Sequence, residues 1–377
     1  MPPKFVFRIK KIAGFGLFKK YSEMAPAKSR REAHFADWVF HRLLTVLSFS
    51  VFLLVISLLW LLADMASPAL KEFGLRFFMT NDWNPPLDEF GALPFVYGTL
   101  VTSFLALLLA APISIGAAVF LSEIAPNWLA KVIGFLVEML AAIPSVVYGL
   151  WGIFVLSPLM QMQVQPTLTR FLGPDTWFAL IINHLFVALI YPFVFVGHLF
   201  GWTTWTLTNV FEVTGKVSNQ LFAGPHFGVG ILTASVVLAI MITPTIAAIS
   251  REVFLTVSPS LKEAALALGA TRWEMIRMSI LQTCKSGMLG AIILGLARAL
   301  GETMAVTMVI GNRNDITAKL MSPGQTMASV IANEYPEATD LHLASLAAIG
   351  LALFAVSLLI NMGARLVIWR VENGLRK

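Results

Sequence analysis

The chain has 377 residues, of which 57% are hydrophobic and 13% charged, and its formal net charge is +6. Soluble domains carry about 25% charged residues, so this composition excludes an ordinary water-soluble protein and predicts a membrane as solvent. A single cysteine, Cys284, excludes an intrachain disulfide framework and a metal site built from several cysteines. The basic residues lie in short loops and termini, with no basic groove of interleaved aromatics, which argues against nucleic acid as a partner.

The first element in chain order is a polar, basic segment over residues 1–38. It has neither the apolar core nor the cleavage site of a signal peptide, so we predict a retained cytoplasmic N-terminal tail. Segment 39–93 then predicts a first transmembrane helix followed by an acidic periplasmic loop.

Six apolar stretches reach the length of about 20 residues that a membrane-spanning helix needs. The loop 251–285 and the C-terminal end with its tail 371–377 are basic, whereas segments 64–93 and 312–341 lean acidic. The positive-inside rule therefore places both termini and the 251–285 loop in the cytoplasm. We predict an all-α polytopic membrane protein whose six main transmembrane helices cover 39–63, 94–121, 132–157, 229–250, 286–311 and 342–368.

A seventh apolar stretch, 177–202, conflicts with an even number of crossings. One further crossing would move the basic loop outside, so we expect a re-entrant or interfacial segment, bent at Pro192, within a periplasmic-side insertion over 159–228. His184 and His198 lie in this segment, and a metal site there is the alternative to interfacial packing. Pro192 argues against the straight helix that such a site would need, so no metal and no cofactor are predicted.

The cytoplasmic loop 251–285 contains two helical patterns joined at a glycine. Pro259 and Ser260 can start a helix through LKEAALAL, Gly269 ends it, and ATRWEMIRMSIL resumes the helical spacing. A cytosolic helix with small apolar residues favours docking into the groove of a partner, and a plain amphipathic linker is the alternative.

The sequence KEAALALGATRWEMIRMSIL in this loop resembles the EAA signature of ABC importer permeases, although Ser279 and Gln282 stand where isoleucine and proline are usual. Four further stretches, 110–126, 138–158, 230–254 and 295–312, resemble the PstC-type phosphate permeases among these importers. The resemblance implies a MetI-like permease domain over 94–370. It also implies that the ATPase-coupling residues are Glu263, Ala264, Ala265 and Gly269.

The resemblance further implies that the chain is one subunit of an ATP-driven importer of inorganic phosphate and has no catalytic site of its own. It places this subunit in the lipid of the inner membrane. The implied partners are a PstA-like second permease, two PstB-like ATP-binding subunits and a PstS-like periplasmic phosphate-binding protein. The absence of a GxxxxGKS or GxxxxGKT loop agrees with ATP binding by another subunit. The residues alone leave open another oxyanion, such as sulfate or molybdate, and a secondary transporter or channel.

Arg298 and Glu302 stand inside the apolar stretch 286–311, where a bilayer-centre arginine costs about 2.5–3.5 kcal/mol. Their four-residue spacing places them one turn apart on one face of the predicted helix. One interpretation is a buried ion pair that only joins helices; the other is a substrate pathway. We favour the pathway, with the Arg298 guanidinium contacting phosphate, Glu302 competing for it on release, and Thr303 and Thr307 adding hydroxyl groups.

Overall fold

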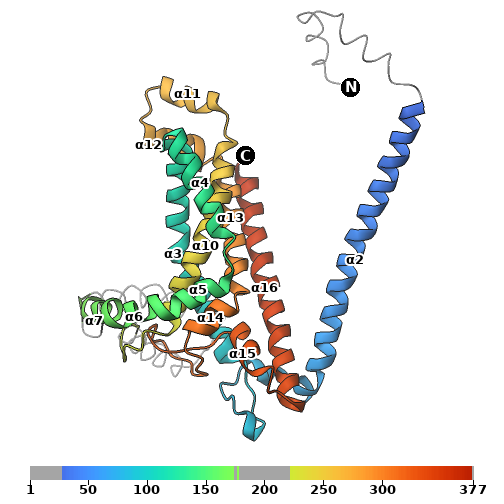
Figure 1. The fold of residues 1–377 in the computed structure, drawn as a ribbon, viewed down its shortest axis with the longest axis vertical. Helices are drawn as coiled ribbons and strands as arrows, with labels where there is room; N and C mark the ends of the chain where they lie inside the picture. The colour runs from blue at the N-terminus through green and yellow to red at the C-terminus, as the bar shows by residue number, and fades with distance from the viewer. Residues whose placement is uncertain (1–27, 174–175, 178–220, 376–377) are drawn as a thin grey trace, which may run out of the picture. The chain divides into compact units, whose positions relative to one another are not determined.

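The computed structural model describes residues 28–173, 176–177 and 221–375, and in these ranges every regular element is helical. The all-α prediction is therefore confirmed. The helices are α2 (Lys28–Phe73), α3 (Leu93–Val119), α4 (Asn127–Ala141), α5 (Ser145–Trp151), α6 (Ser157–Leu159), α7 (Gln165–Leu172), α10 (Ile231–Leu255), α11 (Pro259–Ala267), α12 (Arg272–Met275), α13 (Lys285–Leu300), α14 (Met304–Val309), α15 (Met327–Glu334) and α16 (Asp340–Leu375) (Figure 1).

Short turns of tighter or wider helix adjoin these elements. Turns of 3-10 helix occupy Gly74–Phe78 and Pro85–Leu87. Turns of π-helix occupy Phe120–Ile124, Gly152–Leu156, Met160–Val164 and Ile276–Leu281.

Five described helices are long and apolar enough to cross a membrane, and a sixth is reached if a bent pair of helices is counted as one span. This agrees with the predicted multi-pass protein. The bent pair is Arg272–Leu281 with Lys285–Leu300, at an angle of 74°. The five helices are Trp38–Phe78, Leu93–Ile124, Ser145–Leu172, Ile231–Leu255 and Asp340–Val371.

The chain forms two compact units, residues 1–61 and 62–377. The described part of the first unit belongs to α2, and none of the apolar window of this helix is buried. Helix α2 begins at Lys28, inside the predicted tail 1–38, and continues to Phe73, because the sequence from Lys28 to Trp38 has no glycine or proline to stop it. Residues 178–202 of the predicted apolar stretch 177–202, including His184 and His198, lie outside the described residues, as does the tail before residue 28.

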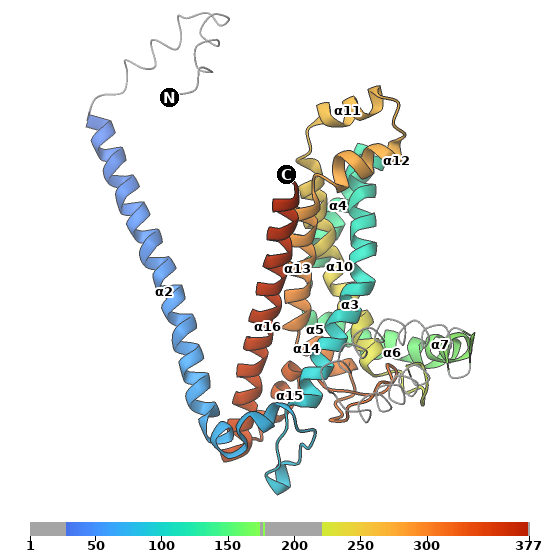
Figure 2. The same ribbon diagram turned by 180° about the vertical axis from the view of Figure 1, so that it is seen from behind.

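The predicted single helix over 132–157 is wrong, because the chain breaks between Ala141 and Ser145. Proline has no N–H donor and disfavours the helical conformation of the preceding residue, so Pro144 stops α4. Helix α4 has 15 residues, fewer than the roughly 20 that span a bilayer. Figure 2 shows, as Figure 1 does, that α4 follows α3 and α10, whereas α5, α6 and α7 run across them.

Small residues bring α3 and α10 together. Ser114 Oγ in α3 donates to the carbonyl oxygen of Thr243 in α10, at 3.1 Å. Because apolar side chains gain little by leaving lipid for protein, close contact of small residues is a main source of helix association in membranes. The residues of α3 that form this face recur every four positions and are fully buried: Ala106, Ala110, Ser114 and Ala118.

Candidate functional site

Arg298 and Glu302 are separated by a helix break. The predicted continuous helix over 286–311 is wrong: α13 ends at Leu300 and α14 begins at Met304. Glu302 lies in the break, where its Oε1 accepts the backbone N–H of Ala305 at 3.2 Å. No ion pair joins Arg298 to Glu302 among the described residues. The break has a local cause, because glycine is a poor helix former and the Glu302 carboxylate that follows Gly301 accepts an N–H from the first turn of the next helix.

The Arg298 guanidinium instead binds the C-terminal end of α4. Its Nη1 donates to Thr245 Oγ1 of α10 at 2.9 Å, and both Nη atoms lie 3.4 Å from the carbonyl oxygen of Ala141. The hydroxyl of Tyr148 donates to the neighbouring carbonyl of Leu140 at 2.9 Å. The last carbonyls of a helix have no partner within it, and a cation is favourable at that negative end. Arg298 therefore connects α4, α10 and α13.

This arrangement leaves the guanidinium able to bind an anion. Arg298 is half-buried, and its Nε has no hydrogen-bond partner among the described residues. A guanidinium carries five N–H donors in a planar fork that fits two oxygens of an oxyanion. Chemically, the site can exchange the long contacts to the α4 carbonyl for contacts to an oxyanion.

The hydroxyl groups of the two threonines near the break donate to backbone carbonyls. Thr303 Oγ1 donates to the carbonyl of Gly301 at 3.4 Å, and Thr307 Oγ1 donates to the carbonyl of Thr303 at 2.7 Å. A hydroxyl has one proton to donate. In this conformation the hydroxyl of Thr307 is occupied, so it would have to rotate to donate to an anion, whereas the contact of Thr303 is beyond the usual length and costs little to replace.

The two helices predicted in the loop 251–285 are present, as α11 and α12. Gly269 ends the first one with φ +89°, a conformation that favours glycine. Its N–H bonds to the carbonyl of Leu266 at 3.0 Å, and the N–H of Ala270 bonds to the carbonyl of Ala265 at 3.2 Å. These two bonds form a Schellman motif, which satisfies carbonyls at the end of α11.

The four predicted coupling residues do not share one face. Glu263 and Ala264 are exposed, Gly269 is exposed at the turn, and Ala265 packs against a buried apolar cluster of the second unit. Large apolar side chains on the same loop are also exposed, which suits an apolar groove of a partner. These exposed side chains, which no motif in the sequence marks as coupling residues, are Leu261, Leu266, Leu268 and Trp273.

Helix α12 begins with a capping box that its sequence, TRWE, already contained. Thr271 Oγ1 accepts the N–H of Glu274, and Glu274 Oε2 accepts the N–H of Thr271 at 2.8 Å. The backbone hydrogen bond from Thr271, reinforced by its hydroxyl, lowers the pKa of Glu274 below its ordinary value. By contrast, no local sequence signal marks Thr245 or Tyr148, which reach Arg298 and α4 through tertiary contacts.

The loop joins α13 through the 74° bend between Leu281 and Lys285. The bend forms although Gln282 stands where the family pattern has proline. Cys284 lies in it, with Sγ 3.5 Å from the carbonyl oxygen of Val253. Burial raises the pKa of the Cys284 thiol.

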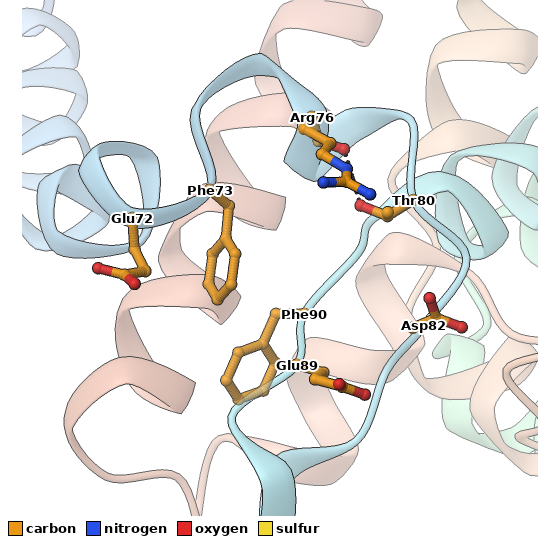
Figure 3. A pocket seen from close by; sticks show the side chains of 7 residues that line it. All are labelled: Glu72, Phe73, Arg76, Thr80, Asp82, Glu89 and Phe90. Carbon is orange, nitrogen blue, oxygen red and sulfur yellow. Dashed lines mark hydrogen bonds between the residues drawn. The ribbon is translucent and has the colours of Figure 1, made fainter.

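A separate pocket of about 300 Å³ lies where α2 ends (Figure 3). The rings of Phe73 and Phe90 meet edge to face in it, with ring centroids 6.1 Å apart. Three carboxylates line the pocket with one guanidinium, so its charge repels an anionic substrate. The charged lining residues are Glu72, Arg76, Asp82 and Glu89. Within the described residues, no group of three or more His, Cys, Asp or Glu side chains is placed to hold a metal ion.

The long apolar helices define a multi-pass α-helical membrane protein. No family model matches the chain. A phosphate transport system permease protein PstC from Pasteurella multocida is 41% identical over 345 residues, which cover 92% of this chain and 95% of the relative. The relative from Mesorhizobium japonicum is 42% identical over 305 residues, or 81% of each chain. The chain belongs to the PstC family of phosphate transport system permease proteins.

A more distant sequence relative agrees with this assignment. PstC 1 from Mycobacterium tuberculosis is 33% identical over 329 residues, covering 82% of this chain and 86% of the relative. Among solved structures, a chain of a bacterial alginate ABC transporter in complex with an alginate pentasaccharide-bound periplasmic protein matches with a TM-score of 0.46. It is 16% identical and covers 88% of this chain and 94% of that one.

Proposed function

We propose that this chain is a permease subunit of an ATP-driven importer that moves inorganic phosphate across the inner membrane. The observation that carries the proposal is the 41% identity over 92% of the chain to a phosphate transport system permease protein. The half-buried Arg298 fork supports an oxyanion as substrate, because a planar guanidinium matches phosphate oxygens in pairs.

The assembly proposed around it contains a second, PstA-like permease, two PstB-like ATP-binding subunits and a PstS-like periplasmic phosphate-binding protein. ATP hydrolysis belongs to the ATP-binding subunits, and this chain has no catalytic role of its own. Both termini and the loop that carries α11 and α12 face the cytoplasm, because the basic residues of the chain gather there.

Within the chain, Arg298 is the principal anion contact and Glu302 tunes release, with Thr303 and Thr307 along the same path. Arg298 holds the α4 carbonyl between substrates and exchanges it for phosphate oxygens during passage. Two of its contacts to that carbonyl are 3.4 Å long, beyond the usual 2.7–3.2 Å, so they cost little to replace.

The ATPase contact is the outer surface of α11 and its terminal glycine, including Glu263, Ala264, Ala265 and Gly269. A cysteine placed at the exposed Ala264, in a Cys284→Ser background, should crosslink to an ATP-binding subunit. A matched cysteine at Lys131, which is exposed on α4, is the control. Crosslinks that reach the ATP-binding subunit from Lys131 as readily as from Ala264 would contradict this placement.

The test of the whole function is an uptake assay on the purified complex in lipid vesicles. ATP hydrolysis and uptake of labelled phosphate should both rise when the phosphate-loaded binding protein is added. Excess sulfate or molybdate should not compete. Stimulation by sulfate or molybdate in place of phosphate would assign another oxyanion. Uptake by this chain without any ATP-binding subunit would replace the importer with a secondary transporter or channel.

A further inference from the structure

One ion pair connects the first cytoplasmic helix to the membrane-embedded bundle. Lys262 Nζ of α11 lies 2.6 Å from Glu123 Oε1, in the π-helical turn Phe120–Ile124 that follows α3. The two residues are 139 positions apart in the sequence. Their side chains are 20% and 8% exposed, so the carboxylate is almost removed from solvent. Exposed ion pairs contribute little, but removing one partner of a desolvated pair leaves an uncompensated charge.

The rest of α11 packs little against the bundle. Lys262 and Ala265, three positions apart and therefore on one face, are the residues of α11 that are not fully exposed. Ala265 has only a methyl group to pack.

The second cytoplasmic helix is attached differently. Met275, Ile276 and Ile280 are buried in an apolar cluster with side chains from α3 and α10. Apolar contacts of this kind are not directional, whereas an ion pair at 2.6 Å fixes the distance between two particular atoms.

The position of Glu123 also favours a role in movement. A π-helical turn within or at the end of an α-helix is a frequent feature of functional sites, because it alters the regular hydrogen-bond ladder. The turn Phe120–Ile124 ends at Ala125, whose backbone is extended, and Pro126 follows it. Glu123 therefore lies at the end of the α3 helix, where a pull on its carboxylate acts on the whole helix.

We propose that the Lys262–Glu123 ion pair is the link through which displacement of α11 by an ATP-binding subunit reaches α3. This inference rests on the proposed function. Both side chains are positioning residues, since neither touches substrate. The pair makes α11 and the end of α3 move together, and α3 carries that motion to α10 through the Ser114 contact.

The first test measures phosphate uptake per ATP hydrolysed by the complete complex in vesicles. Lys262→Met and Glu123→Gln should each lower this ratio about fivefold or more, which is the lower end of usual coupling between sites. Lys262→Arg and the exchange Lys262→Glu with Glu123→Lys should restore it. Lys131→Met, which removes an exposed lysine of α4, is the matched control and should leave the ratio unchanged. Unchanged ratios in both single variants overturn the proposal.

The second test does not depend on the substrate. Spin labels at the exposed Ser260 of α11 and Ile113 of α3 report the distance between the two helices by pulsed electron resonance. In the otherwise native complex, ATP should leave this distance nearly constant, whereas in Lys262→Met it should change and broaden. A distance that changes equally in both overturns the link. If ATP leaves the α11–α3 distance constant in the native complex but no phosphate is taken up, the proposed substrate is wrong. The role of the Lys262–Glu123 ion pair still stands in that case.

Discussion

Replacing Arg298 with glutamine separates a structural role from a role in the pathway. The change removes the charge-assisted bond to Thr245 at 2.9 Å, and such a bond contributes about 1.5–3 kcal/mol. The contacts to Ala141 at 3.4 Å are too long to add much. Because Arg298 is only half-buried, we expect a stability loss of about 2 kcal/mol, which an assembled membrane complex can survive.

The expected effect on transport is larger. Loss of two charge-assisted bonds to phosphate amounts to about 3 kcal/mol, which corresponds to about a 100-fold fall in uptake. Arg298→Lys should restore little of it, since a point charge lacks the planar fork. Uptake in vesicles is measured per assembled complex, with thermal unfolding of the same samples as the stability readout.

Thr245→Val is the matched control, because it removes the structural contact and keeps the guanidinium. It should lower the unfolding temperature and leave uptake per complex close to that of the native protein. Equal uptake by Arg298→Gln and Thr245→Val would refute the pathway role.

Glu302→Gln keeps an oxygen for the Ala305 N–H but removes the charge, so it should reduce uptake without unfolding. Normal uptake by the double replacement Arg298→Met with Glu302→Leu would refute the pathway for both residues.

Three further predictions concern the loops. Gly269→Ala should destabilise the end of α11 by about 1–2 kcal/mol, because φ +89° is unfavourable for alanine. The control is Gly363→Ala, where an added Cβ would meet only open space, and it should not lower the unfolding temperature. A cysteine at the exposed Phe227 should react with an impermeant reagent from outside, and one at Met278 only from inside; the opposite result would invert the topology. Native Cys284 should alkylate more slowly at pH 7 than Met278→Cys and accelerate as the pH rises, because its raised pKa leaves less thiolate; equal rates would contradict its burial.

The sequence by itself determined the class of protein and much of the coupling loop. Apolar length and loop charge depend on local composition, so the starts of the spanning helices α3, α10 and α16 could be predicted to within two residues, whereas α10 and α16 end five and seven residues later than predicted. The helix, glycine and helix around Gly269 could also be predicted, because a left-handed turn and a capping box are both specified by neighbouring residues.

The breaks within apolar stretches were misjudged, although Pro144 and Gly301 stood in the sequence as signals. Hydropathy averaged over a window does not register a single residue that stops a helix, so 132–157 and 286–311 were predicted as unbroken. Because α13 ends at Leu300, Glu302 is not on the same helix as Arg298, and their four-residue spacing does not place them on one face.

Only the tertiary structure decided what each charge contacts. Arg298 contacts Ala141 at the end of α4 and Thr245, which lie 157 and 53 residues away in the sequence. Lys262 contacts Glu123, which lies 139 residues away. No local pattern encodes such pairings, because they arise when helices pack and bring distant side chains within bonding distance. The energy of a charge in a membrane depends on that partner, so the role of each ionisable residue follows from the packed fold.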